Sequence, residues 1–221
     1  MSTPRKLGNS IIWDGVVQQS EEWFRIRAGR PTASNFDKII TATGKYSSQW
    51  DAFAISLTAE TVCRDPWEWT GNRHTDRGNE YEPAAREAFA AHLGMPVCQV
   101  GFVTRADGIV GCSPDAFVLG ADDLPVAGAE IKCPGRDKHA QHLVANALPA
   151  EHLQQVHGSM AVTGLDTWHF VSYFPGLPLL VVKVTRDGYT AKVADALDRF
   201  LIYYDKRRKE VLPILTGKAA A

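Results

Sequence analysis

The amino-acid sequence predicts a mixed α/β fold, in which a central five-stranded mixed sheet is flanked by helices on both sides. Two observations support this fold class. Five runs rich in apolar and β-branched residues are typical of strands, at 97–105, 109–119, 126–133, 167–174 and 179–185. Segments with apolar residues at helical spacing precede, separate and follow these runs, as expected when helices cover a sheet.

Before the first strand, the sequence predicts several helices and one long loop. Ser20 is a suitable N-cap for the first helix, and Gly29 is a suitable end for it. Residues 64–78 are rich in turn formers and predict a loop. The helices expected in this part of the chain are at 21–28, from 32, from 47 or 48, and at 79–93.

The second half of the chain alternates between helices and strands. Two helices, at 136–145 and 149–163, are expected between the third and fourth strands. A final amphipathic helix begins near Tyr189 and directs Val193, Leu197 and Phe200 toward the core.

Composition places the chain among soluble globular proteins. Its 221 residues, 45% hydrophobic and 22% charged, fit a single domain that spans 1–221. No apolar run approaches the roughly 20 residues that span a bilayer, and the first residues lack the apolar stretch of a secretory signal. We therefore expect a cytoplasmic protein with no membrane partner. A net charge of -1 argues only weakly against nucleic acid, because a binding protein can concentrate its positive charge locally.

The cysteines and one pair of histidines give no sign of a soft-metal site. The four cysteines include no Cys-x-x-Cys pair, which argues against a zinc ribbon or an iron–sulfur cluster. We expect each to be a small buried residue. His139 and His142 lie three residues apart on a predicted helix, but no third ligand is evident, so we expect surface histidines.

The most informative motif is Ser113-Pro114-Asp115, followed by Glu130-Ile131-Lys132. If Asp115 lies on the second strand and Glu130 on the third, a hairpin can bring the two carboxylates level. Alternation along a strand gives Glu130 and Lys132 the same face. Carboxylate oxygens suit Mg²⁺, with a phosphate supplying further ligands, so the motif predicts metal-assisted phosphodiester hydrolysis.

A simpler interpretation of this motif has no metal. Asp115 could cap a turn, and Glu130 with Lys132 could form a solvated ion pair. The apolar residues around both carboxylates argue against it, because charges in buried strands are costly unless they are paired or metal-bound.

Several short motifs, taken in order, resemble the viral recombination exonucleases (alkaline exonucleases) typified by that of phage lambda, members of the PD-(D/E)xK nuclease superfamily. The matching segments are Trp23 to Gly29, Thr32-Ala33-Ser34, Gly78 to Glu82 with Ala85-Arg86, Cys112 to Asp115, Glu130 to Pro134, and Gln155 to His157 with Ser159-Met160.

The resemblance implies a restriction-endonuclease-like core and a Mg²⁺-dependent 5′→3′ exonuclease, with Mn²⁺ as the alternative metal and two ions per site. Such an enzyme degrades one strand of linear double-stranded DNA to 5′-mononucleotides and leaves 3′ single-stranded tails for recombination. The resemblance further implies a ring-shaped homotrimer, a phage or prophage origin, and a single-strand annealing protein as partner.

The resemblance also assigns roles in a metal site. Asp115, Glu130 and the backbone carbonyl of Ile131 are the expected metal ligands, and Glu82 is expected to help hold metal. An i,i+4 surface pair between Glu82 and Arg86 would explain the same spacing. Lys132 would orient the attacking water or stabilise the charge of the transition state.

Further residues are expected to bind the DNA end. Arg27 and Ser34 match positions that bind the 5′-phosphate, although Arg25 and Arg30 lie nearby. Gln155 is expected to position the substrate or the water. His157 stands where relatives often have glutamine, and it could donate one hydrogen bond to DNA.

Overall fold

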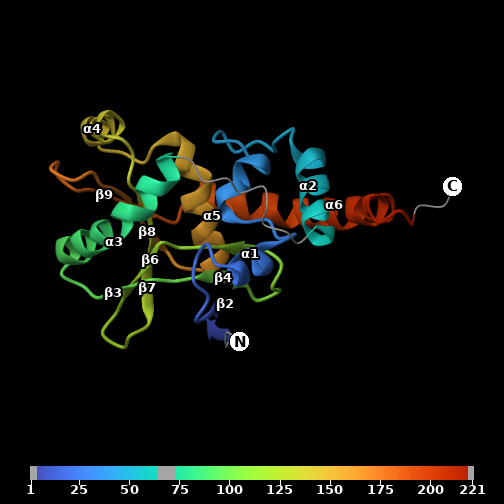
Figure 1. Ribbon diagram of the computed structural model, residues 1–221, viewed down its shortest axis with the longest axis horizontal. Coiled ribbons are helices and arrows are strands. Elements are labelled where there is room, and N and C mark those ends of the chain that lie inside the picture. The colour runs from blue at the N-terminus through green and yellow to red at the C-terminus, as the bar shows by residue number, and fades with distance from the viewer. Residues whose placement is uncertain (1–3, 64–72, 219–221) are drawn as a thin grey trace.

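The computed structural model (Figure 1) describes residues 4–63 and 73–218. A five-stranded sheet in the order β3-β6-β7-β8-β9 lies at its centre. β7 and β8 run parallel and every other neighbouring pair is antiparallel, so the predicted five-stranded mixed sheet is confirmed. Its strands are β3 (Val97–Cys98), β6 (Ala116–Leu119), β7 (Pro125–Lys132), β8 (Thr167–Ser172) and β9 (Leu180–Thr185).

A second, antiparallel sheet lies beside it and is absent from the sequence prediction. Its order is β1-β2-β4-β5, with β1 (Pro4–Leu7), β2 (Ser10–Trp13), β4 (Phe102–Arg105) and β5 (Gly111–Cys112). Gly8-Asn9 forms the turn between β1 and β2, with Gly8 in the left-handed region at φ 52°. Glycine and asparagine between two short runs are a recognised hairpin signal, so this hairpin was predictable.

Two of the predicted strands are each divided between the two sheets. The run 97–105 forms β3 and β4, and the run 109–119 forms β5 and β6. Pro114 has no N–H to donate to a ladder, and it marks the second break. Asp115 therefore lies in the bend before β6, not within a strand as predicted.

The helices agree with the prediction except near their ends. The Ser20 Oγ accepts a hydrogen bond from Trp23 N and caps the first helix, as expected. Of the predicted loop 64–78, residues 64–72 lie outside the described residues, and from Arg73 the chain is already helical. The helices are α1 (Glu21–Arg27), η1 (Ala33–Lys38, 3₁₀), α2 (Trp50–Val62), α3 (Arg73–Leu93), α4 (Arg136–Ala145), η2 (Ala150–His152, 3₁₀), α5 (Leu153–Thr163) and α6 (Gly188–Leu215).

Both faces of the central sheet are covered by apolar contacts. On one face, Phe117 and Trp168 belong to a core shared with α5, α2 and α6. On the other face, Ala85 and Phe89 of α3 pack against β6, β7 and β8. The long helix α6 continues past α2 toward the C-terminus (Figure 1). Within 4–63 and 73–218, no helix combines the length and apolar character that a membrane span needs.

Two predictions about side chains are corrected by the packing of the chain. Cys112 and Cys133 are buried as expected, but Cys63 is exposed. His139 and His142 are buried, not on the surface, because α4 directs both rings toward β8. Their Nδ1 atoms lie 2.9 and 3.0 Å from the Ser172 Oγ.

The buried histidine of β8 predicts a pH dependence of stability. Burial, followed by the charge of Lys183, lowers the pKa of His169 to about 4, and its Nδ1 has no hydrogen-bond partner in the part of the chain that the structure describes. The unfolded chain takes up this proton near pH 6.5, so stability is lost as the pH falls from 6.5 toward 4. Relative to the parent, His169→Leu should become more stable below pH 6.5, by up to about 1.4 kcal/mol per pH unit.

Urea unfolding of the parent and of His169→Leu at pH 8, 6.5 and 5 measures this difference. A difference in unfolding free energy that is the same at all three pH values would contradict the prediction.

Candidate active site

The carboxylate of Asp115 is hydrogen-bonded to β7, the strand that carries Glu130. The register pairs Ala116 with Ala129, so Asp115, one residue earlier, lies beside Glu130. Asp115 N donates to the carbonyl of Ala129 at 3.1 Å, and Asp115 Oδ2 accepts from Ile131 N at 2.6 Å. The side chain thus extends the ladder to the residue before β6 begins, and the hairpin expected from the sequence does bring the two carboxylates together.

Glu130 and Lys132 share one face of β7, as alternation predicts. The Glu130 side chain is only 2% exposed, and its carboxylate forms an ion pair with the Lys132 ammonium. The pair is therefore buried on the Glu130 side rather than solvated. Ile131 packs on the opposite face. Because N–H and C=O of one residue in an antiparallel pair point to the same neighbour, the Ile131 carbonyl points toward the Asp115 side.

A third carboxylate approaches from α3. Glu82 forms the i,i+4 ion pair with Arg86 that its spacing allowed, and its side chain is 23% exposed. The Arg86 Nε in turn donates to the carbonyl oxygen of Asp115 at 3.1 Å. The ion pair that the spacing allowed is therefore present, and Glu82 lies near enough to Asp115 for the two carboxylates to influence each other. Its part in holding a metal stays a prediction.

The cluster has an excess of negative charge. Burial, and then the charge of Asp115, raises the pKa of Glu130 to about 8 and that of Glu82 to about 7. Burial also raises the pKa of Asp115. Burial lowers the pKa of Lys132, but the charges of Glu130 and Asp115 more than offset this, and the pKa is raised. Three carboxylates near one ammonium and one guanidinium favour an added cation.

The donor set fits a hard divalent cation. Among the described residues, no three His, Cys, Asp or Glu side chains form a ligand group by themselves. The nearest equivalent is Asp115, Glu130 and the backbone carbonyl of Ile131, which offer oxygen atoms alone. Mg²⁺ is commonly bound by one or two carboxylates and completes its octahedron with water and phosphate, so these residues fit it.

Arg27 forms a separate cationic subsite at the end of α1. Its guanidinium lies 4.1 Å from the centroid of the Trp23 ring and donates to the Ser113 Oγ at 3.0 Å. It also donates to the hydroxyls of Thr32 and Ser34, at 3.1 and 3.3 Å. Within the described residues it forms no ion pair with a carboxylate. Burial lowers the pKa of Arg27 to about 10, so it remains a cation at neutral pH, surrounded by hydroxyl groups.

The structure therefore brings Arg27 and Ser34 together, and it adds Thr32 and Ser113, which sequence reasoning missed. Ser113 stands inside the motif that contains Asp115, so its position was a usable signal. The nearby Arg25 instead pairs with Glu21 on the surface. Arg30 donates to the carbonyl of Gly108 and does not join the subsite.

Gln155 and His157 do not share a site. Residues two apart on a helix do not face each other. His157 is 3% exposed, and its Nδ1 lies 2.8 Å from the Thr190 Oγ1 of α6. The structure thus places His157 in the core and does not bring it to the predicted DNA-binding residues. Gln155 is half-buried on α5.

His152, one turn before Gln155, is a neighbour of the site that sequence reasoning missed. Its ring stacks on Phe170 with 5.2 Å between centroids. Burial, followed by the charge of Lys132, lowers the pKa of His152 to about 4. The helical spacing to Gln155 was the available signal.

Comparison with known families assigns the chain to one of them. A sequence model of the YqaJ-like viral recombinase domain matches residues 22–166, a span that includes Arg27, Asp115, Glu130 and Lys132. The chain belongs to this family. The predicted likeness to viral recombination exonucleases is thereby confirmed. No curated protein matches the chain.

Solved structures agree with the YqaJ-like assignment. An alkaline exonuclease from Laribacter hongkongensis, LHK-Exo, is 28% identical with a TM-score of 0.75, covering 91% of this chain and 100% of its own. The same coverage and TM-score are found for LHK-Exo in complex with dAMP, at 27% identity. A phage-related exonuclease from Haemophilus somnus 129PT shares the fold, at 17% identity and a TM-score of 0.60, covering 82% of this chain and 96% of its own.

Proposed function

We propose that this YqaJ-like chain is a Mg²⁺-dependent exonuclease that degrades one strand of linear double-stranded DNA in the 5′→3′ direction. It would release 5′-mononucleotides and leave 3′ single-stranded tails for recombination. Family membership and the likeness to LHK-Exo support the exonuclease class. That relative has been solved with dAMP, a deoxynucleoside monophosphate, which supports a mononucleotide product.

One observation carries the proposal. The Arg27 subsite and the carboxylate cluster share the turn Ser113-Pro114-Asp115, with Ser113 facing Arg27 and Asp115 facing Ile131 and Glu130. Two residues of chain extend at most about 7 Å. A terminal phosphate bound by Arg27 would therefore hold the next phosphodiester close to the carboxylates. Such an arrangement favours cutting at an end over cutting within a duplex.

The roles of the residues follow from their chemistry. Asp115, Glu130 and the Ile131 carbonyl would hold a divalent ion, and Glu82 would help to hold a second. When bound, such an ion supplies Lewis-acid stabilisation of the phosphate and an activated water. Lys132 places a positive charge where negative charge develops on the phosphate.

The DNA end would be held by a second group of residues. Arg27 and the hydroxyls of Thr32, Ser34 and Ser113 would bind the terminal 5′-phosphate through charge-assisted hydrogen bonds. Gln155 would position the substrate or the attacking water.

Digestion of three substrates tests the function. With Mg²⁺, linear duplex bearing a 5′-phosphate should be degraded to mononucleotides, the same duplex with a 5′-hydroxyl much more slowly, and a closed circle not at all. A chelator should stop the reaction, and Mn²⁺ should be tried as the alternative metal. Cutting of the circle would instead favour a restriction-like endonuclease of the same superfamily.

Family likeness also leads us to propose a cytoplasmic, phage- or prophage-encoded homotrimer that works with a single-strand annealing protein. A ring around DNA would provide a physical basis for repeated cutting without release. We therefore expect sedimentation to give a mass near three times 24.3 kDa.

A further inference from the structure

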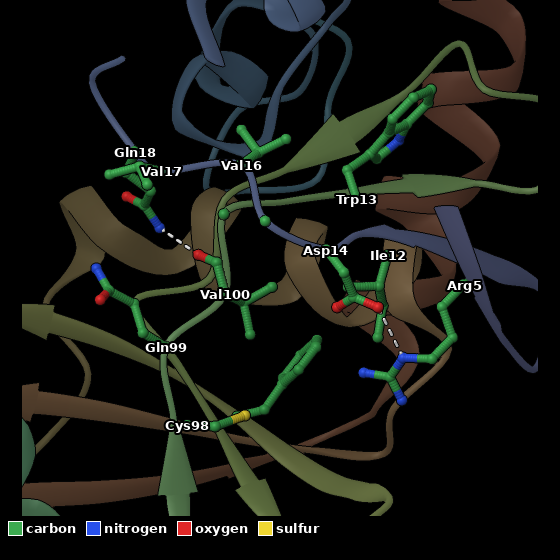
Figure 2. A pocket seen from close by; sticks show the side chains of 13 residues that line it. Arg5, Ile12, Trp13, Asp14, Val16, Val17, Gln18, Cys98, Gln99 and Val100 are labelled. Carbon is green, nitrogen blue, oxygen red and sulfur yellow. Dashed lines mark hydrogen bonds and ion pairs between the residues drawn. The ribbon is translucent and has the colours of Figure 1, made fainter. Parts of the chain in front are cut away.

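The short segment 16–19, just before α1, connects the two sheets beside the candidate site. The side-chain amide of Gln18 donates from Nε2 to the carbonyl of Val100 at 2.7 Å, as Figure 2 shows, and to the carbonyl of Pro114 at 2.9 Å. Val100 lies between β3 and β4, and Pro114 lies between β5 and β6. One side chain thus joins both places where the chain passes from one sheet to the other.

Two further observations show that this segment has a defined position. A Cβ at Gly101 would lie 1.8 Å from the Val16 carbonyl oxygen, so only glycine allows this approach. Gln19 has a left-handed backbone at φ 66°. Such a conformation is unfavourable in a non-glycine residue, and it persists where the surroundings determine it.

We propose that Gln18 is a positioning residue for Asp115, and through Asp115 for the metal site, an inference that rests on the proposed function. The Pro114 carbonyl belongs to the peptide that joins Pro114 to Asp115. Holding that carbonyl holds the backbone from which the Asp115 carboxylate reaches Ile131 N. The flanking strands β5 and β6 have two and four residues, so their own ladders provide few bonds near this turn.

The Gln18 contact is distinct from the one that holds the phosphate subsite. Trp23 Nε1 donates to the Ser113 Oγ at 2.9 Å and to the Gly101 carbonyl at 3.2 Å. Gln18 therefore acts on the Pro114–Asp115 side of the turn, whereas Trp23 acts on the Ser113 side. The proposal concerns metal binding and not recognition of the 5′-phosphate.

Gln18→Met is the test variant, because methionine keeps the length of the side chain and removes both donated hydrogen bonds. A cavity of about 230 Å³, which Gln18 lines, gives the methionine side chain room. Gln99→Met is the matched control, since Gln99 lines the same cavity but is exposed and joins neither carbonyl. Gln18→Glu, which has the same shape and no donor when ionised, repeats the test if the methionine variant does not fold.

The first measurement needs no metal. Amide hydrogen exchange of Ile131, which donates to Asp115 Oδ2, should be about 10-fold faster in Gln18→Met, as expected for the loss of hydrogen bonds that hold the turn, and unchanged in Gln99→Met. The second measurement is Mg²⁺ affinity by calorimetry. Its Kd should rise about 10-fold in Gln18→Met alone, in the range typical when a residue supporting a metal ligand is lost.

The outcomes are distinguishable. Exchange at Ile131 equal to that of the parent would overturn the proposal, and so would faster exchange spread evenly over all strands. Faster exchange confined to Ile131 and the Asp115 turn, together with weaker Mg²⁺ binding, supports it. Faster local exchange with an unchanged Mg²⁺ Kd would support the positioning of Asp115 but contradict the metal site of the proposed function.

Discussion

Replacing Glu130 with glutamine should reduce Mg²⁺-dependent DNA hydrolysis by about 10³-fold or more. Glutamine keeps the size of the side chain but removes the charge of a buried carboxylate that we propose as a metal ligand. A bound metal contributes several kcal/mol to transition-state stabilisation, and each 1.36 kcal/mol corresponds to a factor of ten in rate. The effect is measured as initial rates on 5′-phosphorylated linear duplex, at a Mg²⁺ concentration that saturates the parent enzyme.

The matched control is Glu151→Gln. Glu151 also pairs with a lysine, Lys138, but that ion pair is half-exposed, at 51% and 52% of the two side chains. Its loss should leave the rate within about twofold, because exposed pairs contribute little. Thermal unfolding should show that both variants are folded. A Glu130→Gln variant with the parent's rate would remove Glu130 from the proposed ligand set.

Replacing Arg27 with alanine should slow digestion of 5′-phosphorylated ends by about 10²-fold to 10³-fold, while 5′-hydroxyl ends change little. Hydrogen bonds to a charged group contribute about 1.5–3 kcal/mol each, and a guanidinium can offer two to one phosphate. Arg27→Lys should fall between alanine and the parent, because an ammonium cannot form the planar fork. The measurement is the ratio of rates on the two kinds of end.

Arg25→Ala provides the control for this second effect. Arg25 lies on the same helix, but it is exposed and paired with Glu21. Its loss should leave the preference for a 5′-phosphate intact. An equal loss on phosphorylated and hydroxyl ends in Arg27→Ala would indicate that Arg27 stabilises the fold and does not recognise the phosphate.

The parts of the site that depend on local periodicity were predictable from the sequence. Glu130 and Lys132 share a face because successive residues of any strand alternate, and this requires no knowledge of the rest of the fold. The same reasoning, applied to the helix of Gln155, would have favoured His152 over His157 as its neighbour. His157 was selected by likeness to relatives, and its contact with Thr190 of α6 depends on packing between distant segments.

The division of strands between two sheets could be predicted only in part. Pro114 was a visible signal, since proline interrupts a ladder. The break near Gly101 depends on the backbone of Val16, a contact between distant parts of the chain that no local pattern encodes. The burial of His139 and His142 against Ser172 is likewise decided by where α4 lies on the sheet.

The short turn from Ser113 to Asp115 has a consequence for the length of the product. The DNA end would be bound by Arg27 together with Ser113, and the metal by Asp115, two residues after Ser113. The short turn would therefore limit the distance between the bound phosphate and the bond that is cut. Fluctuations of the fold, temperature and salt would then alter the rate at which the enzyme cuts, but not the length of each released fragment. Inserting a glycine after Ser113 would lengthen this distance, so that it would no longer match the length of a single nucleotide.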